Sequence, residues 1–126
     1  MRYVIPVVLI LIAIIHALPL LGVGGGARLA TLYGIADMDA SLEILMRHRA
    51  VLFGLLAAFL AYAAFKPELH ALALLGATVS VVSFLAFALL TGGYNAAVAT
   101  VVKVDAVAAV LLVLGWAVHL ARDVAR

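Results

Sequence analysis

Four long apolar segments constrain this chain more than any other feature of its sequence. A transmembrane helix needs about 20 consecutive, mostly apolar residues, and such runs recur four times, over residues 3–22, 46–65, 69–90 and 97–120. The chain is 69% hydrophobic and only 11% charged, which leaves too little polar surface for a water-soluble domain. We therefore expect an all-α polytopic membrane protein, with residues 1–126 forming a single transmembrane domain.

The connections between these segments predict how the helices are arranged. Residues 66–68 and 91–95 are short enough to be turns, and short turns join antiparallel neighbours, which predicts an antiparallel four-helix bundle. Residues 23–45 form the long connection, with a short interfacial helix expected within it. Asp37 or Asp39 can cap the next helix, because a carboxylate accepts hydrogen bonds from the free N–H groups at a helix start.

Several classes of function are excluded or disfavoured by composition. The chain has no cysteine, which excludes disulfides, thiolate nucleophiles and thiolate metal sites. Its formal net charge is +2 and no nucleic-acid motif accompanies that charge, so we predict no nucleic-acid partner. The first apolar segment is too long for a signal peptide and lacks a small-x-small cleavage site, so we expect it to be retained as a span.

Ionisable side chains gather at one end of the predicted bundle. Arg47, His48 and Arg49 open the second segment. By the rise of an α-helix, His16 lies roughly 9 Å from the same end of the first segment, and Asp105 lies on the order of 12 Å deep in the fourth. Charged groups at such depth are costly and mark sites or paired contacts. We predict that all five residues form a polar pocket near the outer leaflet.

Helical geometry allows only one of the two arginines to face inward. Residues two positions apart differ by roughly 200° around a helix, so Arg47 and Arg49 cannot both face the interior. We place Arg49 inward beside Asp105 and place Lys103 at the membrane interface. A fixed ion pair that only joins the second and fourth segments is an open alternative. The long connection also offers candidates for a lid over the pocket, namely Tyr33, Asp37, Asp39 and Glu43, although a solvated loop with an interfacial aromatic is the favoured interpretation.

Three hypotheses for function follow. In the first, the pocket binds or transports a small molecule, anionic or a lipid headgroup: an arginine holds its negative group, Asp105 orients that arginine, and His48 or His16 carries a proton. In the second, the chain is an accessory subunit that packs against a partner or a second copy through small residues such as Gly54 and Ala58. In the third, His16 and His48 ligate haem or a metal. The leading hypothesis needs no cofactor and no metal, and the sequence identifies no reaction.

The distribution of basic residues favours one orientation in the membrane. Arg2, Lys66, Arg122 and Arg126 lie on the side of both termini, and Arg28, Arg47, Arg49 and Lys103 lie on the other. Of the second set, Arg47, Arg49 and Lys103 lie at or inside helix ends rather than in free loops. Discounting them, the positive-inside rule places both termini in the cytoplasm of a bacterial inner membrane.

The run Arg47-His48-Arg49-Ala50-Val51-Leu52-Phe53-Gly54, preceded by Leu32-Tyr33-Gly34, resembles an uncharacterised family of small four-helix bacterial membrane proteins. Ser83-Phe84 and the position of Asp105 are also similar. The resemblance covers most of the chain and implies a four-helix fold and a shared polar site, but no activity. Members are sometimes labelled phosphopantetheine adenylyltransferase, an enzyme with a soluble fold whose HxGH motif this chain lacks.

Overall fold

The computed structural model describes residues 1–125, and all regular structure within them is helical. Its elements are α1 (Val4–Ala17), the 3₁₀ helix η1 (Leu18–Gly24), α2 (Gly26–Tyr33), α3 (Ala40–Ala63), the 3₁₀ helix η2 (Pro67–Leu69), α4 (His70–Thr91) and α5 (Ala96–Val124). Within the described residues, four helical stretches are long and apolar enough to cross a membrane: α1 with η1, α3, η2 with α4, and α5. The predicted all-α architecture with four such helices is confirmed. Arg126 lies outside the described residues.

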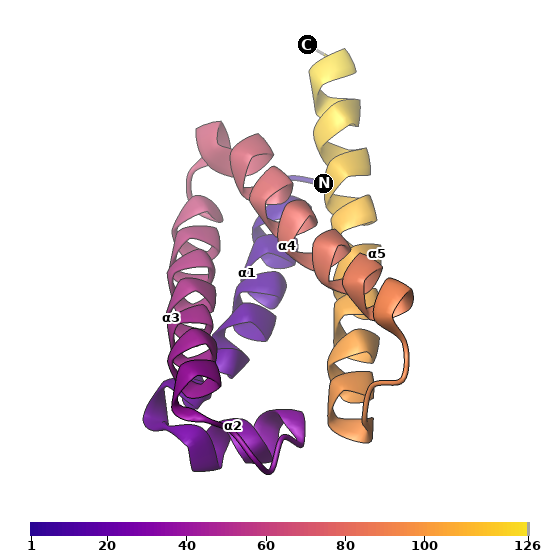
Figure 1. The fold of residues 1–126 in the computed structure, drawn as a ribbon. Coiled ribbons are helices and arrows are strands. Elements are labelled where there is room, and N and C mark those ends of the chain that lie inside the picture. Colours follow the sequence, from indigo (N-terminus) through magenta and orange to yellow (C-terminus); the bar gives the residue numbers. More distant parts are fainter. Residues whose placement is uncertain (126) are drawn as a thin grey trace.

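The long helices alternate in direction (Figure 1). α1 and α4 run away from the end of the molecule that carries both termini, and α3 and α5 run back toward it. α2 lies across the opposite end. α1 packs against both α3 and α5, and α4 packs against α5. α4 crosses the bundle obliquely, from the upper end of α3 toward the middle of α5.

Helix α1 supplies the centre of the core. Its Ile5, Leu9 and Ile12 are fully buried and belong to one cluster with residues of α3, α4 and α5. The close approach of α5 depends on Gly115, where a Cβ atom would lie 2.8 Å from Leu74 Cδ2. A side chain there has no room, so the glycine lets the α5 backbone pack directly against its neighbours.

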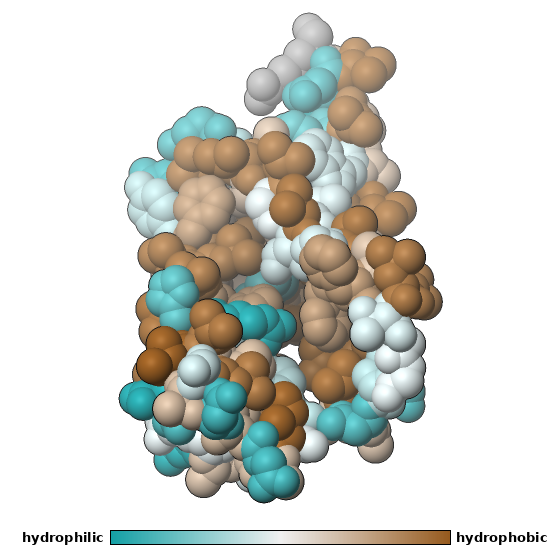
Figure 2. All heavy atoms as spheres, in the orientation of Figure 1, coloured by the Kyte–Doolittle hydropathy of each residue, from teal (hydrophilic) through white to brown (hydrophobic). Residues whose placement is uncertain are grey.

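The outside of the bundle is as apolar as its inside. Large hydrophobic side chains are exposed on every long helix, for example Ile14 at 56%, Leu55 at 68%, Val79 at 61% and Val110 at 70%. Figure 2 shows hydrophobic residues over much of the visible face, with many of the hydrophilic residues gathered toward its lower end. Monomeric soluble proteins rarely expose apolar surface on this scale.

Local signals in the sequence account for the helix boundaries. α1 ends at Ala17 and continues as η1, with Pro19 in the first turn of η1, which agrees with the early end predicted from the missing proline N–H. α3 begins at Ala40 and continues through the apolar segment that starts at residue 46. The Asp39 carboxylate caps it, as predicted, by accepting a hydrogen bond from the Leu42 N–H at 2.7 Å. α5 continues beyond residue 120 to Val124.

Candidate functional site

A cavity of about 390 Å³ lies between the helices at the α2 end of the bundle. Its walls come from α1, η1, α2, α3, α4 and α5: Ile15, His16, Leu18, Pro19, Thr31, Leu32, Tyr33, Arg49, Phe53, Phe84, Ala97, Thr100, Val101, Val104 and Asp105. Most of these residues are apolar or aromatic, and a few polar groups converge among them. Both the volume and the lining are typical of small-molecule sites.

Arg49 is the positively charged side chain that lines this cavity, and two aromatic side chains hold it in place. Its Nη1 donates to the Tyr33 hydroxyl at 3.1 Å. The guanidinium carbon lies 4.6 Å from the centre of the Phe53 ring and 5.5 Å from that of Tyr33, within the range of cation–π attraction. A guanidinium has five N–H donors, and only the bond to Tyr33 uses one of them among residues 1–125. The remaining donors are available to a ligand.

Asp105 lines the same cavity from α5. The predicted ion pair with Arg49 is wrong: the pairs within 4.0 Å in the described part of the chain are Arg47 with Glu43 and His119 with Asp123. Arg49 instead contacts Tyr33, and the cavity separates α3 from α5. The two opposite charges therefore share one space without touching. Lys103 is exposed, as its predicted interfacial position requires.

His16 is a buried bridge between α1 and α4, with an exposed fraction of 2%. Its Nδ1 lies 2.9 Å from the Ile12 carbonyl oxygen, and its Nε2 lies 3.0 Å from the Ser80 hydroxyl. Because a carbonyl oxygen only accepts, Nδ1 is the donor there, and Nε2 of the neutral imidazole accepts from the Ser80 hydroxyl. Both nitrogens are occupied, so His16 supports the cavity wall.

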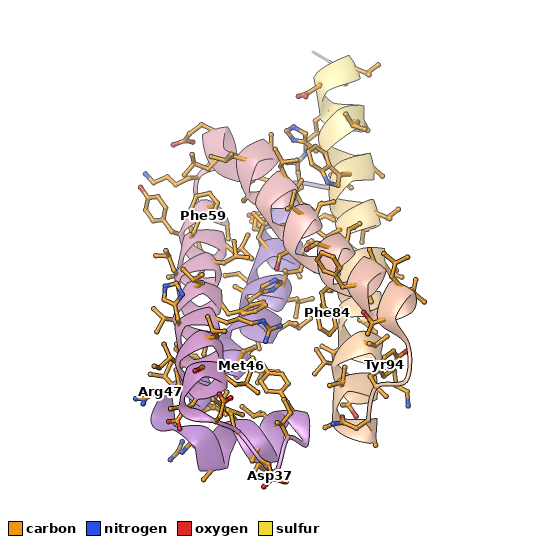
Figure 3. The ribbon with its side chains drawn as sticks, viewed as in Figure 1. Asp37, Met46, Arg47, Phe59, Phe84 and Tyr94 are labelled. Carbon is orange, nitrogen blue, oxygen red and sulfur yellow. The ribbon has the colours of Figure 1, made fainter. Side chains whose placement is uncertain are left out.

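Arg47 and His48 lie outside the cavity, which corrects the predicted five-residue pocket. Arg47 Nε donates to the Val23 carbonyl at 3.1 Å and its Nη1 lies 3.4 Å from Glu43 Oε1. Figure 3 shows this side chain pointing away from the bundle interior. His48 is exposed on α3. Helical rotation of roughly 100° per residue thus brings only Arg49 of the basic triplet to the cavity.

Helix α2 covers one end of the cavity and is fastened at Tyr33. Asn95 Nδ2 donates to the Tyr33 carbonyl oxygen at 2.8 Å and lies 3.3 Å from that of Gly34. The Tyr33 side chain is almost fully buried, with 8% exposed. Of the predicted lid residues only Tyr33 lines the cavity. Asn95 falls in the predicted turn over residues 91–95, and its contact with α2 was not predicted, although an asparagine directly before a helix is a recognisable N-cap signal.

The structure gives no support to a paired-histidine site. Within residues 1–125, no group of three or more His, Cys, Asp or Glu side chains is arranged to hold a metal ion. His16 lines the cavity and His48 does not, so the two imidazoles have no shared space.

Comparison with known proteins adds no assignment: no family model, no curated protein and no solved structure matches the chain. The family resemblance carried by residues 47–54 stays a prediction.

Proposed function

We propose that this chain is a multi-pass membrane protein that binds a small molecule with a negatively charged group, and that Arg49 is the anchor for that group. The observation that carries the proposal is the Arg49 guanidinium, held against Phe53 and Tyr33 with donors unused, in a cavity of about 390 Å³. A preorganised arginine binds carboxylate or phosphate with little further loss of conformational freedom.

The membrane setting is supported by the outer surface. Four apolar helices expose large hydrophobic side chains along their length, and lipid is the solvent in which such a surface is stable. Both termini lie at the end opposite α2 (Figure 1). With the positive-inside rule, we propose that this end faces the cytoplasm of a bacterial inner membrane and that the cavity lies toward the outer leaflet.

Asp105 adds a second requirement for the ligand. An ionised carboxylate accepts hydrogen bonds and donates none, and its own helix and neighbours supply it with no hydrogen bond among residues 1–125. A ligand that reaches both charges therefore carries a donor as well as an anionic group.

The subunit hypothesis is less well supported, because some of the small residues on which it rests are used inside the chain. A Cβ atom at Gly54 would lie 2.6 Å from Leu20 Cδ1, so this position already packs against η1. Ser80 is bonded to His16. Ala58, Ala117 and Ala121 remain exposed, and they are the positions through which a second copy would pack closely.

Native mass spectrometry of protein purified in a mild detergent tests the binding proposal. We expect the wild type to retain one bound species, Arg49→Ala to lose it, and Arg47→Ala to retain it, since Arg47 is the matched arginine outside the cavity. Arg49→Lys keeps the charge without the planar fork and should show reduced occupancy, which separates loss of binding from failure to fold. A ligand-free wild type, or equal occupancy in Arg49→Ala and the wild type, contradicts the proposal.

A further inference from the structure

Helix α2 covers one end of the cavity, and the cavity opens to the outside between the long helices. Leu32 and Tyr33 of α2 form part of its end wall. Three residues that line it, Leu18, Thr31 and Thr100, are exposed on the outside of the molecule. Figure 2 shows the surface hollowed between α3 and the first half of α5. A ligand therefore has a route into the cavity that does not require α2 to move.

Exposed apolar side chains lie on η1 and α3 beside residues that line the cavity. Leu18 is 52% exposed, and the exposed Leu20 and Leu21 follow it on η1. Leu52, next to Phe53 on α3, is 50% exposed. In a membrane these side chains face acyl chains, so the opening connects the cavity with lipid.

A second, smaller hollow of about 200 Å³ adjoins the cavity. Arg49, Leu52, Phe53 and Leu56 of α3 and Ser80 of α4 line it. Arg49 and Phe53 line both spaces, so their side chains form the partition between them. Apart from Arg49 and Ser80 the groove is apolar, and it suits a hydrocarbon chain better than a polar group.

We propose that the ligand is a membrane-resident amphiphile with one hydrocarbon chain and a zwitterionic phosphate–ammonium headgroup, and that it enters sideways from the bilayer. This inference rests on the proposed function. The phosphate binds Arg49, the ammonium binds Asp105, and the chain passes Phe53 into the groove between α3 and α4. An anionic headgroup alone would bring negative charge toward the Asp105 carboxylate in a medium of low dielectric constant, where repulsion is strong.

Photo-crosslinking tests this assignment. The protein is reconstituted in phosphatidylcholine vesicles that contain lysophosphatidylethanolamine with a diazirine in its acyl chain, and the labelled peptides are identified after irradiation. We expect label on the α3–α4 groove near Leu52 and Leu56. Arg49→Ala should reduce labelling about tenfold, because it removes a charge-assisted hydrogen bond to the phosphate. Arg47→Ala should label like the wild type.

Thr100→Trp, with Val107→Trp as its control, tests the route of entry, and Asp105→Asn tests the headgroup. Thr100→Trp narrows the side opening without touching Arg49 or Asp105 and should reduce labelling, whereas Val107→Trp adds the same bulk at an exposed position of α5 outside the cavity and should not. The wild type should prefer this probe over diazirine-labelled lysophosphatidic acid, which lacks the ammonium, and Asp105→Asn should weaken that preference. Equal labelling in Thr100→Trp and Val107→Trp, or no change of preference in Asp105→Asn, overturns the inference.

Competition separates a failure of this inference from a failure of the proposed function. Unlabelled lysophosphatidylethanolamine should displace the probe, and water-soluble glycerophosphoethanolamine should not. If the chainless compound competes equally well and Arg49→Ala abolishes labelling, Arg49 still binds an anion but the ligand is not a lipid. If labelling does not depend on Arg49, both proposals fail.

Discussion

Asn95 joins the start of α5 to the end of α2: its Nδ2 donates to the Tyr33 carbonyl oxygen at 2.8 Å. The same side chain accepts a hydrogen bond from the Val98 N–H at 2.9 Å through Oδ1 and so caps α5. One amide therefore holds the cover of the cavity and begins the helix that carries Asp105.

Substitutions of Asn95 should separate these two contacts. Asn95→Asp keeps a side-chain oxygen that can cap α5, so the first turn of α5 should stay intact. It replaces the N–H donor with a carboxylate oxygen, which the Tyr33 and Gly34 carbonyl oxygens repel, so the end of α2 should become less stable. Asn95→Ala removes both and should cost α5 about a further 1 kcal/mol. Hydrogen exchange measured by mass spectrometry checks this. Unchanged exchange over residues 26–33 in Asn95→Asp contradicts the predicted role.

Ser80→Ala should destabilise the bundle, because it leaves the buried His16 Nε2 without its partner. The expected cost is about 1–3 kcal/mol. Ser83→Ala is the matched control, since among residues 1–125 the exposed Ser83 hydroxyl bonds only to the Ser80 carbonyl of its own helix. Unfolding in mixed micelles with increasing dodecyl sulfate measures both. If the two variants unfold at the same midpoint as the wild type, the bridge between α1 and α4 adds nothing to stability.

Two glycines should respond oppositely to alanine. At Gly115 the new methyl group would lie 2.8 Å from the fully buried Leu74, so Gly115→Ala should cost about 1–3 kcal/mol through overpacking. At Gly76 the nearest atom, Leu56 Cδ1, is 3.9 Å away, and Gly76→Ala should be neutral or gain up to about 1 kcal/mol of helix propensity. Thermal unfolding in detergent ranks the variants, and an equal loss in both would contradict the described packing of α5.

Single cysteines should report the orientation in the membrane, since the chain has none of its own. Asp37 lies near the α2 end (Figure 3), and Glu68 lies in η2 at the opposite end; both are exposed. With cytoplasmic termini, an impermeant maleimide should label Asp37→Cys in intact spheroplasts and Glu68→Cys only after permeabilisation. The reverse pattern contradicts the proposed orientation, and labelling of both without permeabilisation contradicts a membrane-spanning chain.

The positions of the helices were predictable because they depend on local sequence signals. Apolar runs, the Asp39 cap and Pro19 act within a few residues of the chain, so their effects can be read from the sequence. Rotation around α3 likewise predicted that only one of Arg47 and Arg49 faces inward, and Arg49 is the one that lines the cavity. The partner of Arg49 was not predictable in this way, because Tyr33 comes from the long connection rather than from a span.

The remaining site residues could not be predicted, because the helices that carry them are hydrophobic on all sides. In a helix that is apolar on all sides, no periodic pattern distinguishes the inner face from the outer one. Periodicity therefore did not predict Phe53, Phe84 or Ser80 as site residues, although Phe53 and Phe84 line the cavity and Ser80 holds His16. The expected Asp105–Arg49 pair failed for a related reason: the sequence shows depth along each helix but not the separation between helices.

The change from α1 to η1 also sets how far the first segment reaches. The 14 α-helical residues of α1 rise about 1.5 Å each and extend about 21 Å, short of a hydrocarbon layer about 30 Å thick. The 7 residues of η1 rise about 2.0 Å each and add about 14 Å. Pro19 thus lies where the α-helix gives way to a narrower 3₁₀ helix with a larger rise per residue, and α1 and η1 together are long enough to cross such a layer.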